Sequence, residues 1–291
     1  MSTLLTAPRV LRLGQVSTRW SPRTALTTVI ATLAAAILCV LSLGVGDLSL
    51  SPSQVLEVLS GGGTRQEQLV VITLRLTRTL LGLLVGAMLA VSGAIVQTTT
   101  RNGLASPDLL GITAGAGTAA VAVIILGGPS TNAPGASSLL HAFGTSGAAL
   151  VGGFAAALTV STILKMTSGG RLQMLLVGVG TSALFGGLTS WMLIAASIED
   201  AEKANAWLAG SLNGRGSEEV VMAALALGIV GVVLVPLSTR IPALNLGSDM
   251  ATALGQNAQR SRGALLLCSV VLASIAAAVA GPIGFVALVS P

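Results

Sequence analysis

The chain has 291 residues, of which 53% are hydrophobic and 9% charged, and its formal net charge is +5. Soluble domains carry about 25% charged residues, so this composition excludes an ordinary water-soluble protein. The basic residues are dispersed between apolar stretches and form no single patch, which argues against binding to nucleic acid.

The N-terminal residues 1–23 form a basic segment that we expect to lie in the cytoplasm. It contains Arg9, Arg12, Arg19 and Arg23. The charge-free run that follows is longer than the core of a cleaved signal peptide, which has about 7–15 apolar residues. The sequence therefore predicts a retained first membrane span over roughly 25–45.

Charged residues also bound the later apolar stretches, and a helix needs about 20 apolar residues to cross a bilayer. The longest stretch, residues 109–164, has no charged residue and is broken at 127–138, so it predicts two spans. The predicted spans after the first cover roughly 79–100, 107–127, 140–164, 172–198, 220–239 and 263–280, and an apolar piece follows at 284–291. We therefore predict an all-α, polytopic membrane helix bundle with seven complete spans and a cut-off eighth, in one transmembrane domain over residues 24–291.

The distribution of basic residues predicts the orientation of these spans. With the N-terminus in the cytoplasm, the segments on that side hold ten of the 15 Lys and Arg residues. This bias follows the positive-inside rule. Small residues four apart, at Gly82 and Gly86, Gly111 and Gly115, and Gly178 and Ser182, predict close helix packing within the bundle.

Nothing in the sequence indicates catalysis. There is no phosphate-binding loop of the form G-x-x-x-x-G-K-[ST]. His141 is the only histidine, and Cys39 and Cys268 lie apart in apolar runs. We expect no catalytic residue, no metal site and no cofactor in this chain, and hence a protein that is not an enzyme.

Three polar segments are more specific than simple membrane anchors. Arg75 and Arg78 lie three residues apart at the predicted outer mouth of the second span, so they would share one face of a helix. There they would either reach lipid headgroups or dock an acidic partner. Residues 100–117 join two spans on the predicted inner side, with Pro107 suited to the start of a helix. The third segment, residues 243–262, also lies on that side.

The third segment predicts two short helical pieces hinged at Gly255, with Ser248 as N-cap. Leu246, Met250 and Leu254 would form one apolar stripe along it. Its charge is weak, so a groove on a protein partner is the better predicted target than a lipid surface.

The ordered motifs of the chain resemble those of FecCD-type permeases, which are subunits of ABC importers for ferric siderophores, haem and cobalamin. The resemblance rests on RLTRTLLGLLVGAMLAVSGAIVQ, RNGLASPDLLGITAGAG, WLAGSLNG, LGSDMATALGQNAQRSR and AGPIGFVALVSP, in that order. It covers nearly the whole chain. It implies transport of a ferric siderophore or similar metal chelate across the bacterial cytoplasmic (inner) membrane.

The resemblance also implies partners and roles. A second permease, identical or paralogous, would pair with this chain, a cytosolic ABC ATPase would bind ATP and Mg²⁺, and an extracytoplasmic binding protein would deliver the chelate. Arg75 and Arg78 match docking residues for that binding protein. ATPase coupling is implied for Leu246, Gly247, Asp249, Leu254 and Gly255, and a role at the pathway or gate for Asn102, Leu104, Thr181 and Ser182.

Two departures from the family pattern stand out. Gly103 replaces a proline that is usual at this position, and the chain stops at Pro291 although the family has ten spans. We therefore expect the C-terminal spans to be missing. The alternatives are a haem or cobalamin permease, an ion-coupled secondary transporter and an inert truncated remnant; the absence of charges within the spans argues against ion coupling.

Overall fold

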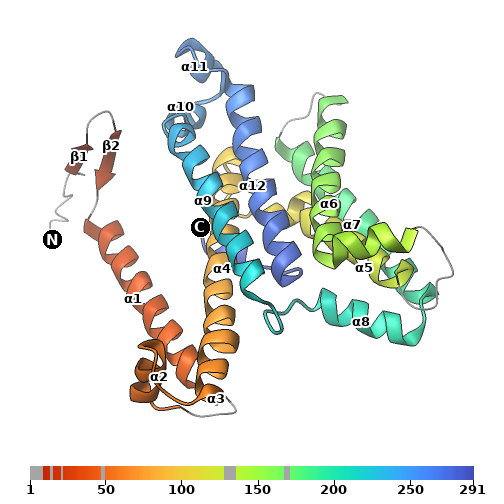
Figure 1. Cartoon of the computed structure of the whole chain (residues 1–291). Coiled ribbons are helices and arrows are strands. Elements are labelled where there is room, and N and C mark those ends of the chain that lie inside the picture. The colour runs from red at the N-terminus through yellow and green to blue at the C-terminus, as the bar shows by residue number, and fades with distance from the viewer. Residues whose placement is uncertain (1–8, 14–15, 21, 47–49, 128–135, 167–170) are drawn as a thin grey trace, which may run out of the picture. The chain divides into compact units, whose positions relative to one another are not determined.

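The computed structural model describes residues 9–13, 16–20, 22–46, 50–127, 136–166 and 171–291. The described chain is helical almost throughout, which confirms the predicted class (Figure 1). One antiparallel pair of short strands, β1 (Arg9–Leu13) and β2 (Val16–Trp20), lies in the basic N-terminal segment and was not predicted. The chain falls into two compact units, residues 1–79 and 80–291.

The first unit contains the long helix α1 (Pro22–Gly44), two short helices, α2 (Pro52–Leu59) and α3 (Arg65–Gln68), and the π-helix η1 (Leu69–Leu76). The short helices begin where the sequence supplies capping boxes, Ser51 with Gln54 and Thr64 with Glu67. A small core joins α1, α2 and η1 through Leu43, Leu50, Val55, Val58 and Val71.

Helix α4 (Thr77–Thr100) continues η1 and leads into the second unit. That unit contains η2 (Pro107–Leu110, a 3-10 turn), α5 (Ile112–Leu126), α6 (Ala136–Met166), α7 (Arg171–Ala195), α8 (Ile198–Leu208), α9 (Ser217–Ser238), α10 (Ile241–Leu246), α11 (Ser248–Ala253), α12 (Ala258–Ala280) and α13 (Val286–Val289).

Six helices of the described chain are long and apolar enough to cross a membrane: Ala25–Gly44, Arg65–Thr100, Gly144–Met166, Gln173–Ala195, Ser217–Ser238 and Ala258–Ala280. Each overlaps a predicted span. The remaining predicted span, the third, over 107–127, contains instead a short turn and the 15-residue helix α5. At about 1.5 Å per residue, α5 is about 22 Å long, less than the roughly 30 Å of a hydrocarbon core.

Helix α12 is the centre of the second unit, because most of its length is buried. It contacts α4 through the buried hydroxyls of Ser92 and Ser269, whose oxygens lie 2.7 Å apart. Helices α5 and α6 cross closely at two glycines: a Cβ atom on Gly152 would lie 2.2 Å from the carbonyl oxygen of Gly115. Small residues and buried hydroxyl pairs thus hold this bundle together, as expected for helices in lipid.

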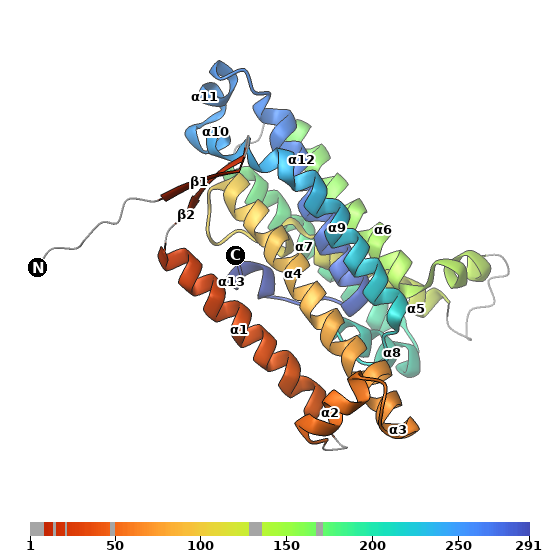
Figure 2. The ribbon, with the colours of Figure 1, turned by 60° about the vertical axis from the view of Figure 1, so that its left-hand side comes forward.

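The second unit has two distinct ends. Helices α10 and α11 lie beyond the ends of α9 and α12, and α8 lies at the opposite end (Figures 1 and 2). At the α8 end, two of the sequence motifs meet: the backbone N–H of Ser211 donates to the carbonyl oxygen of Ala280 at 2.8 Å. The chain approaches closely there because Gly210 and Gly281 both have positive φ, 71° and 78°.

Candidate functional site

The 3-10 turn η2 packs against the first half of α7. The approach is close because Gly178 has no side chain, and a Cβ atom there would lie 2.0 Å from the carbonyl oxygen of Leu109. The Ser182 hydroxyl donates to the carbonyl oxygen of Gly178 at 3.0 Å and to that of Asp108 at 3.4 Å. Thr181 is buried beside it. The structure thus places two of the predicted pathway residues, Thr181 and Ser182, against this turn.

Asn102 and Leu104, the other two predicted pathway or gate residues, lie in the loop between α4 and η2. The Oδ1 atom of Asn102 accepts a hydrogen bond from the backbone N–H of Leu104 at 3.0 Å. The backbone N–H of Ala105 donates to the carbonyl oxygen of Asn102 at 3.1 Å. These bonds fix residues 102–105 as a turn, with the Leu104 side chain 73% exposed. The role of these residues in a gate stays a prediction.

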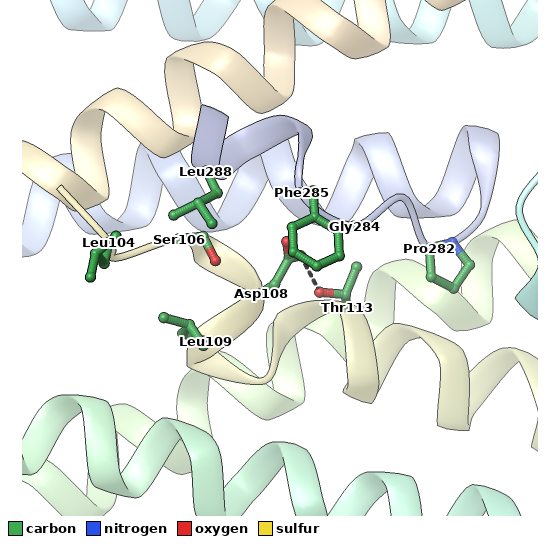
Figure 3. A pocket seen from close by; sticks show the side chains of 9 residues that line it. All are labelled: Leu104, Ser106, Asp108, Leu109, Thr113, Pro282, Gly284, Phe285 and Leu288. Atoms are coloured by element: carbon green, nitrogen blue, oxygen red, sulfur yellow. Dashed lines mark hydrogen bonds between the residues drawn. The ribbon is translucent and has the colours of Figure 1, made fainter. Parts of the chain in front are cut away.

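A pocket of about 400 Å³ lies next to this turn. Two parts of the chain form it, residues 104–113, which run from the loop after α4 into the start of α5, and residues 282–288, which run from the stretch after α12 into α13 (Figure 3). It is lined by Leu104, Ser106, Asp108, Leu109, Thr113, Pro282, Gly284, Phe285 and Leu288. Its size is within the range of ligand pockets, about 300–1,000 Å³, and its lining is mostly apolar with a few polar groups.

Asp108 is the charged residue of this pocket. Its carboxylate accepts a hydrogen bond from the Thr113 hydroxyl, which points toward it (Figure 3). Burial raises the pKa of the Asp108 carboxyl above its ordinary value, and the bond from Thr113 opposes that rise. Asp108 lies outside the six candidate spans. The sequence alone does not reveal the burial of Asp108, because that burial depends on contacts between segments that are distant in sequence.

Replacing this carboxyl should stabilise the protein. A raised pKa means that the ionised form of Asp108 is disfavoured in the folded state. The stability of the wild-type protein therefore falls as the pH rises through the folded pKa and the carboxyl loses its proton. We expect Asp108→Asn to raise the melting temperature in detergent near pH 8, with the gain shrinking below about pH 4, where the unfolded carboxyl is also protonated.

Thermal unfolding of both proteins across this pH range measures the effect. Glu218→Gln, which removes an exposed carboxyl, is the control and should leave the melting temperature unchanged. A gain for Asp108→Asn that does not vary with pH would contradict the electrostatic explanation.

The predicted coupling segment consists of two short helices, but their boundaries differ from the prediction. The break between α10 and α11 falls at Gly247, whose φ of 121° and ψ of 162° are open to glycine alone. Gly247 also occupies the N-cap position predicted for Ser248. Gly255, with φ 76°, follows the end of α11, and the second predicted piece is the start of the long α12. The side chains of Ser248 and Asp249 lie outside the described part of the chain.

The apolar side chains of this segment are exposed. Leu246 is 63% exposed, Met250 53% and Leu254 60%. These three exposed residues belong to different elements: Leu246 ends α10, Met250 lies in α11 and Leu254 directly follows α11. Apolar groups grouped at a helix-bundle end, with polar neighbours, are typical of a surface that a partner covers.

Two arginines connect this segment to the bundle through hydrogen bonds. A guanidinium nitrogen of Arg101, Nη2, donates to the carbonyl oxygen of Leu244 near the end of α10. Arg240 lies 3.4 Å from the hydroxyl of Ser261 on α12. These bonds could not be predicted from the sequence, because the acceptors lie 143 and 21 residues away along the chain.

Arg75 and Arg78 occupy different environments. Arg75, in η1, donates from Nη1 to the carbonyl oxygens of Leu43 and Gly44 at 2.9 and 3.3 Å, at the C-terminal end of α1. Arg78, in α4, is exposed. The prediction of a shared face assumed an α-helix starting at this point, whereas the helix is continuous over Arg65–Thr100 and passes through a π-helical section. Docking by the pair stays a prediction, with Arg75 engaged by α1.

No group of three or more His, Cys, Asp or Glu side chains that could hold a metal ion occurs among the described residues. The free thiol of Cys268 is buried in α12, and Cys39 lies in α1.

Comparison with known proteins identifies the family. The model of the FecCD transport family matches residues 33–291. The chain is 36% identical to the ferric enterobactin transport system permease protein FepG of Escherichia coli (strain K12), over 84% of this chain and 71% of that protein. It is 38% identical to the achromobactin transport system permease protein CbrC of Dickeya dadantii (strain 3937), over 94% of this chain and 77% of that protein.

A solved structure supports the same relationship. It is described as an inward-facing conformation of a metal-chelate type ABC transporter, and it aligns with a TM-score of 0.75 at 26% identity. The alignment covers 92% of this chain and 79% of that one. Together with the six apolar spans, these matches show that the chain belongs to the FecCD transport family and is a multi-pass membrane permease of the ABC importer type.

Proposed function

We propose that this chain is the transmembrane permease subunit of an ATP-driven importer that carries a ferric siderophore or a similar metal chelate into a bacterial cell. The family match and the printed functions of the relatives, one of which transports ferric enterobactin, support this substrate class. The chelate would pass beside the second unit's pocket, whose lining is mainly apolar. A large chelate needs a weakly binding pathway so that it can leave again.

The observation that carries the proposal is the exposed apolar surface of α10 and α11. We name Leu246, Met250 and Leu254 the coupling patch. It lies at one end of the second unit, and Arg101 joins its α10 helix to the loop that leads into the pocket. A cytosolic ATPase that binds ATP and Mg²⁺ would cover this patch, and its movement would reach the pathway through the same contacts.

The remaining partners follow from the importer type. A second permease, identical or paralogous, would complete the pathway, and an extracytoplasmic binding protein would deliver the chelate at the α8 end. The N-terminus and the coupling patch would lie on the cytoplasmic side of the inner membrane, in agreement with the excess of basic residues there.

Uptake measurements test this function directly. The chain would be expressed with its ATPase and binding protein in a strain that lacks its own FecCD permeases, with radiolabelled ferric enterobactin, ferric citrate and cobalamin as probes. We expect uptake of a ferric probe that stops when ATP is depleted and survives an uncoupler while ATP is maintained. Uptake that collapses with the uncoupler alone would contradict the proposal, as would the absence of uptake for every probe.

The exposed arginine provides a separate prediction. Arg78→Glu should weaken capture of the binding protein by about tenfold and reduce its salt dependence, because a rim charge acts mainly through electrostatic attraction. Arg75→Gln should instead lower thermal stability, since it removes bonds to the α1 carbonyls. Binding measured at several salt concentrations distinguishes the two roles. Unchanged capture by Arg78→Glu would favour contact of this side chain with lipid headgroups.

A further inference from the structure

Arg101 holds together two parts of the second unit that are distant in sequence. It is the first residue after α4, and its side chain reaches the carbonyl oxygen of Leu244, 143 residues further along the chain. Leu244 is itself buried and belongs to the main apolar core. Its carbonyl oxygen also accepts the backbone N–H of Gly247 at 3.3 Å, where α10 ends. The guanidinium therefore binds the end of α10, which carries Leu246 of the coupling patch.

The backbone of Arg101 is unusual for its residue type. Its φ is 51°, in the left-handed region that favours glycine. The backbone N–H of Arg101 donates to Thr98 at 3.3 Å and that of Asn102 to Gln97 at 3.1 Å. This is the helix-ending arrangement in which glycine is usual at the left-handed position. An arginine at this position has a less favourable backbone conformation than a glycine would have, but it provides a long side chain with a cationic donor. This cost points to a role for the side chain.

The other side of Arg101 leads directly to the pocket. Asn102 follows it in the chain and closes the turn of residues 102–105 through its bonds to Leu104 and Ala105. Leu104 lines the pocket, and so do Ser106 and Asp108 a few residues later. A displacement of residue 101 would therefore move residues 102–105 together, because hydrogen bonds hold them in one turn.

We propose that Arg101 is a positioning residue that transmits displacement of α10 to the turn at residues 102–105 and thereby to the pocket. The inference rests on the proposed function, because it assumes that an ATPase moves α10. A hydrogen bond from a charged donor to a carbonyl oxygen is stronger than one between neutral groups. The bond from Arg101 can therefore hold when α10 moves toward the turn or away from it. Arg240 does not duplicate it, because Arg240 is the N-cap residue of α10 and its bond joins the start of that helix to Ser261 on α12, not to the turn at residues 102–105.

Arg101→Gly separates this role from a purely structural one. Glycine suits the left-handed backbone better than arginine does, so the variant should fold at least as stably as the wild type while lacking the guanidinium. Arg101→Lys is the companion variant, which keeps the charge but loses the planar fork. Lys165→Gln is the matched control, because it removes a positive charge from an exposed residue at the end of α6, outside the coupling segment.

The assay uses the assembled transporter in lipid vesicles, with ATPase binding, ATP hydrolysis and uptake of ferric enterobactin, or whichever ferric probe the wild type carries, measured separately. We expect Arg101→Gly to keep ATPase binding and basal hydrolysis and to lose about tenfold in chelate imported per ATP hydrolysed, the factor expected for one charge-assisted bond. Arg101→Lys should fall between it and the wild type, and Lys165→Gln should match the wild type. Wild-type coupling in Arg101→Gly would overturn the inference.

Hydrogen exchange of the purified chain provides a readout that does not need transport. Arg101→Gly should accelerate exchange of the amides in residues 102–105 and in α10 together, and Lys165→Gln should not. Exchange unchanged in both places would overturn the inference even if transport were altered. Failure of the proposed function would be seen differently, as a wild-type transporter without ATP-driven uptake of any probe.

Discussion

A chain that carries Met250→Glu and Leu254→Glu should no longer capture its cytosolic ATPase. Both side chains are more than half exposed and apolar, and they lie one helical turn apart at the end of the second unit. If the ATPase groove covers them, each glutamate would bring a carboxylate into a desolvated apolar contact. Loss of central apolar contacts of this kind costs about 2–4 kcal/mol each, which reduces affinity by more than tenfold.

Co-purification with the ATPase in detergent, followed by a titration to measure Kd, checks this result. Asn245→Glu with Gln259→Glu is the control pair, since it adds the same charge to exposed polar residues at the same end of the unit. The control should bind normally. Equal capture by both double variants would rule out the coupling patch as the ATPase contact.

The second large effect is expected at the crossing of α5 and α6. Gly152→Ala should destabilise the bundle by about 3 kcal/mol, because its Cβ atom would lie 2.2 Å from the Gly115 carbonyl oxygen and 2.5 Å from the Ala119 Cβ atom. Neither neighbour can move without separating the helices. The same substitution on α7, Gly180→Ala, meets no atom within 4 Å and should be neutral or stabilising by up to about 1 kcal/mol.

Thermal unfolding in detergent, with the oligomeric state checked by size-exclusion chromatography, measures the pair. The expected result is a lower melting temperature for Gly152→Ala and an unchanged or slightly higher one for Gly180→Ala. If both variants behaved alike, close glycine packing would not be what holds α5 to α6.

Hydropathy was sufficient to predict most of the helices, because a charge-free run of sufficient length has few alternatives in lipid. The first span, predicted over roughly 25–45, is the helix Ala25–Gly44, and the sixth, over roughly 220–239, is Ser217–Ser238. The prediction of a span at 107–127 was too long because hydropathy does not detect a 3-10 turn. The strands β1 and β2 were not predicted, because their sequences show no regular alternation of apolar and polar residues.

Glycine spacing was a partial guide to packing. Gly178 is tightly packed as predicted, whereas a Cβ atom on Gly86 would meet nothing within 4 Å. Gly111 has a positive φ and ends η2, so it belongs to a turn and not to a helix face. Spacing reports which residues share a helix face, but not which face meets a neighbour.

The candidate site was predicted by segment but not by contact. The turn at residues 102–105, η2 with α7, and the exposed α10–α11 surface all lie in the predicted segments. The bonds that organise them, from Arg101 to Leu244 and from Arg75 to the end of α1, join residues 143 and 32 positions apart. A single sequence carries no signal for such pairs, because an arginine at a span end is equally suited to lipid headgroups.

The most direct test of this account is the side of the membrane on which the coupling patch lies. Glu218 lies in the first turn of α9, and Asn245 lies in α10, beyond the other end of α9. The 22 residues of α9 span about 33 Å, enough to cross a bilayer. Each would be changed to cysteine in a chain whose Cys39 and Cys268 are alanine, and intact cells would be treated with a membrane-impermeant maleimide. The account predicts labelling of Glu218→Cys from outside and of Asn245→Cys only after permeabilisation. Labelling of Asn245→Cys in intact cells would place the patch outside, where no ATPase could reach it, and would contradict the account.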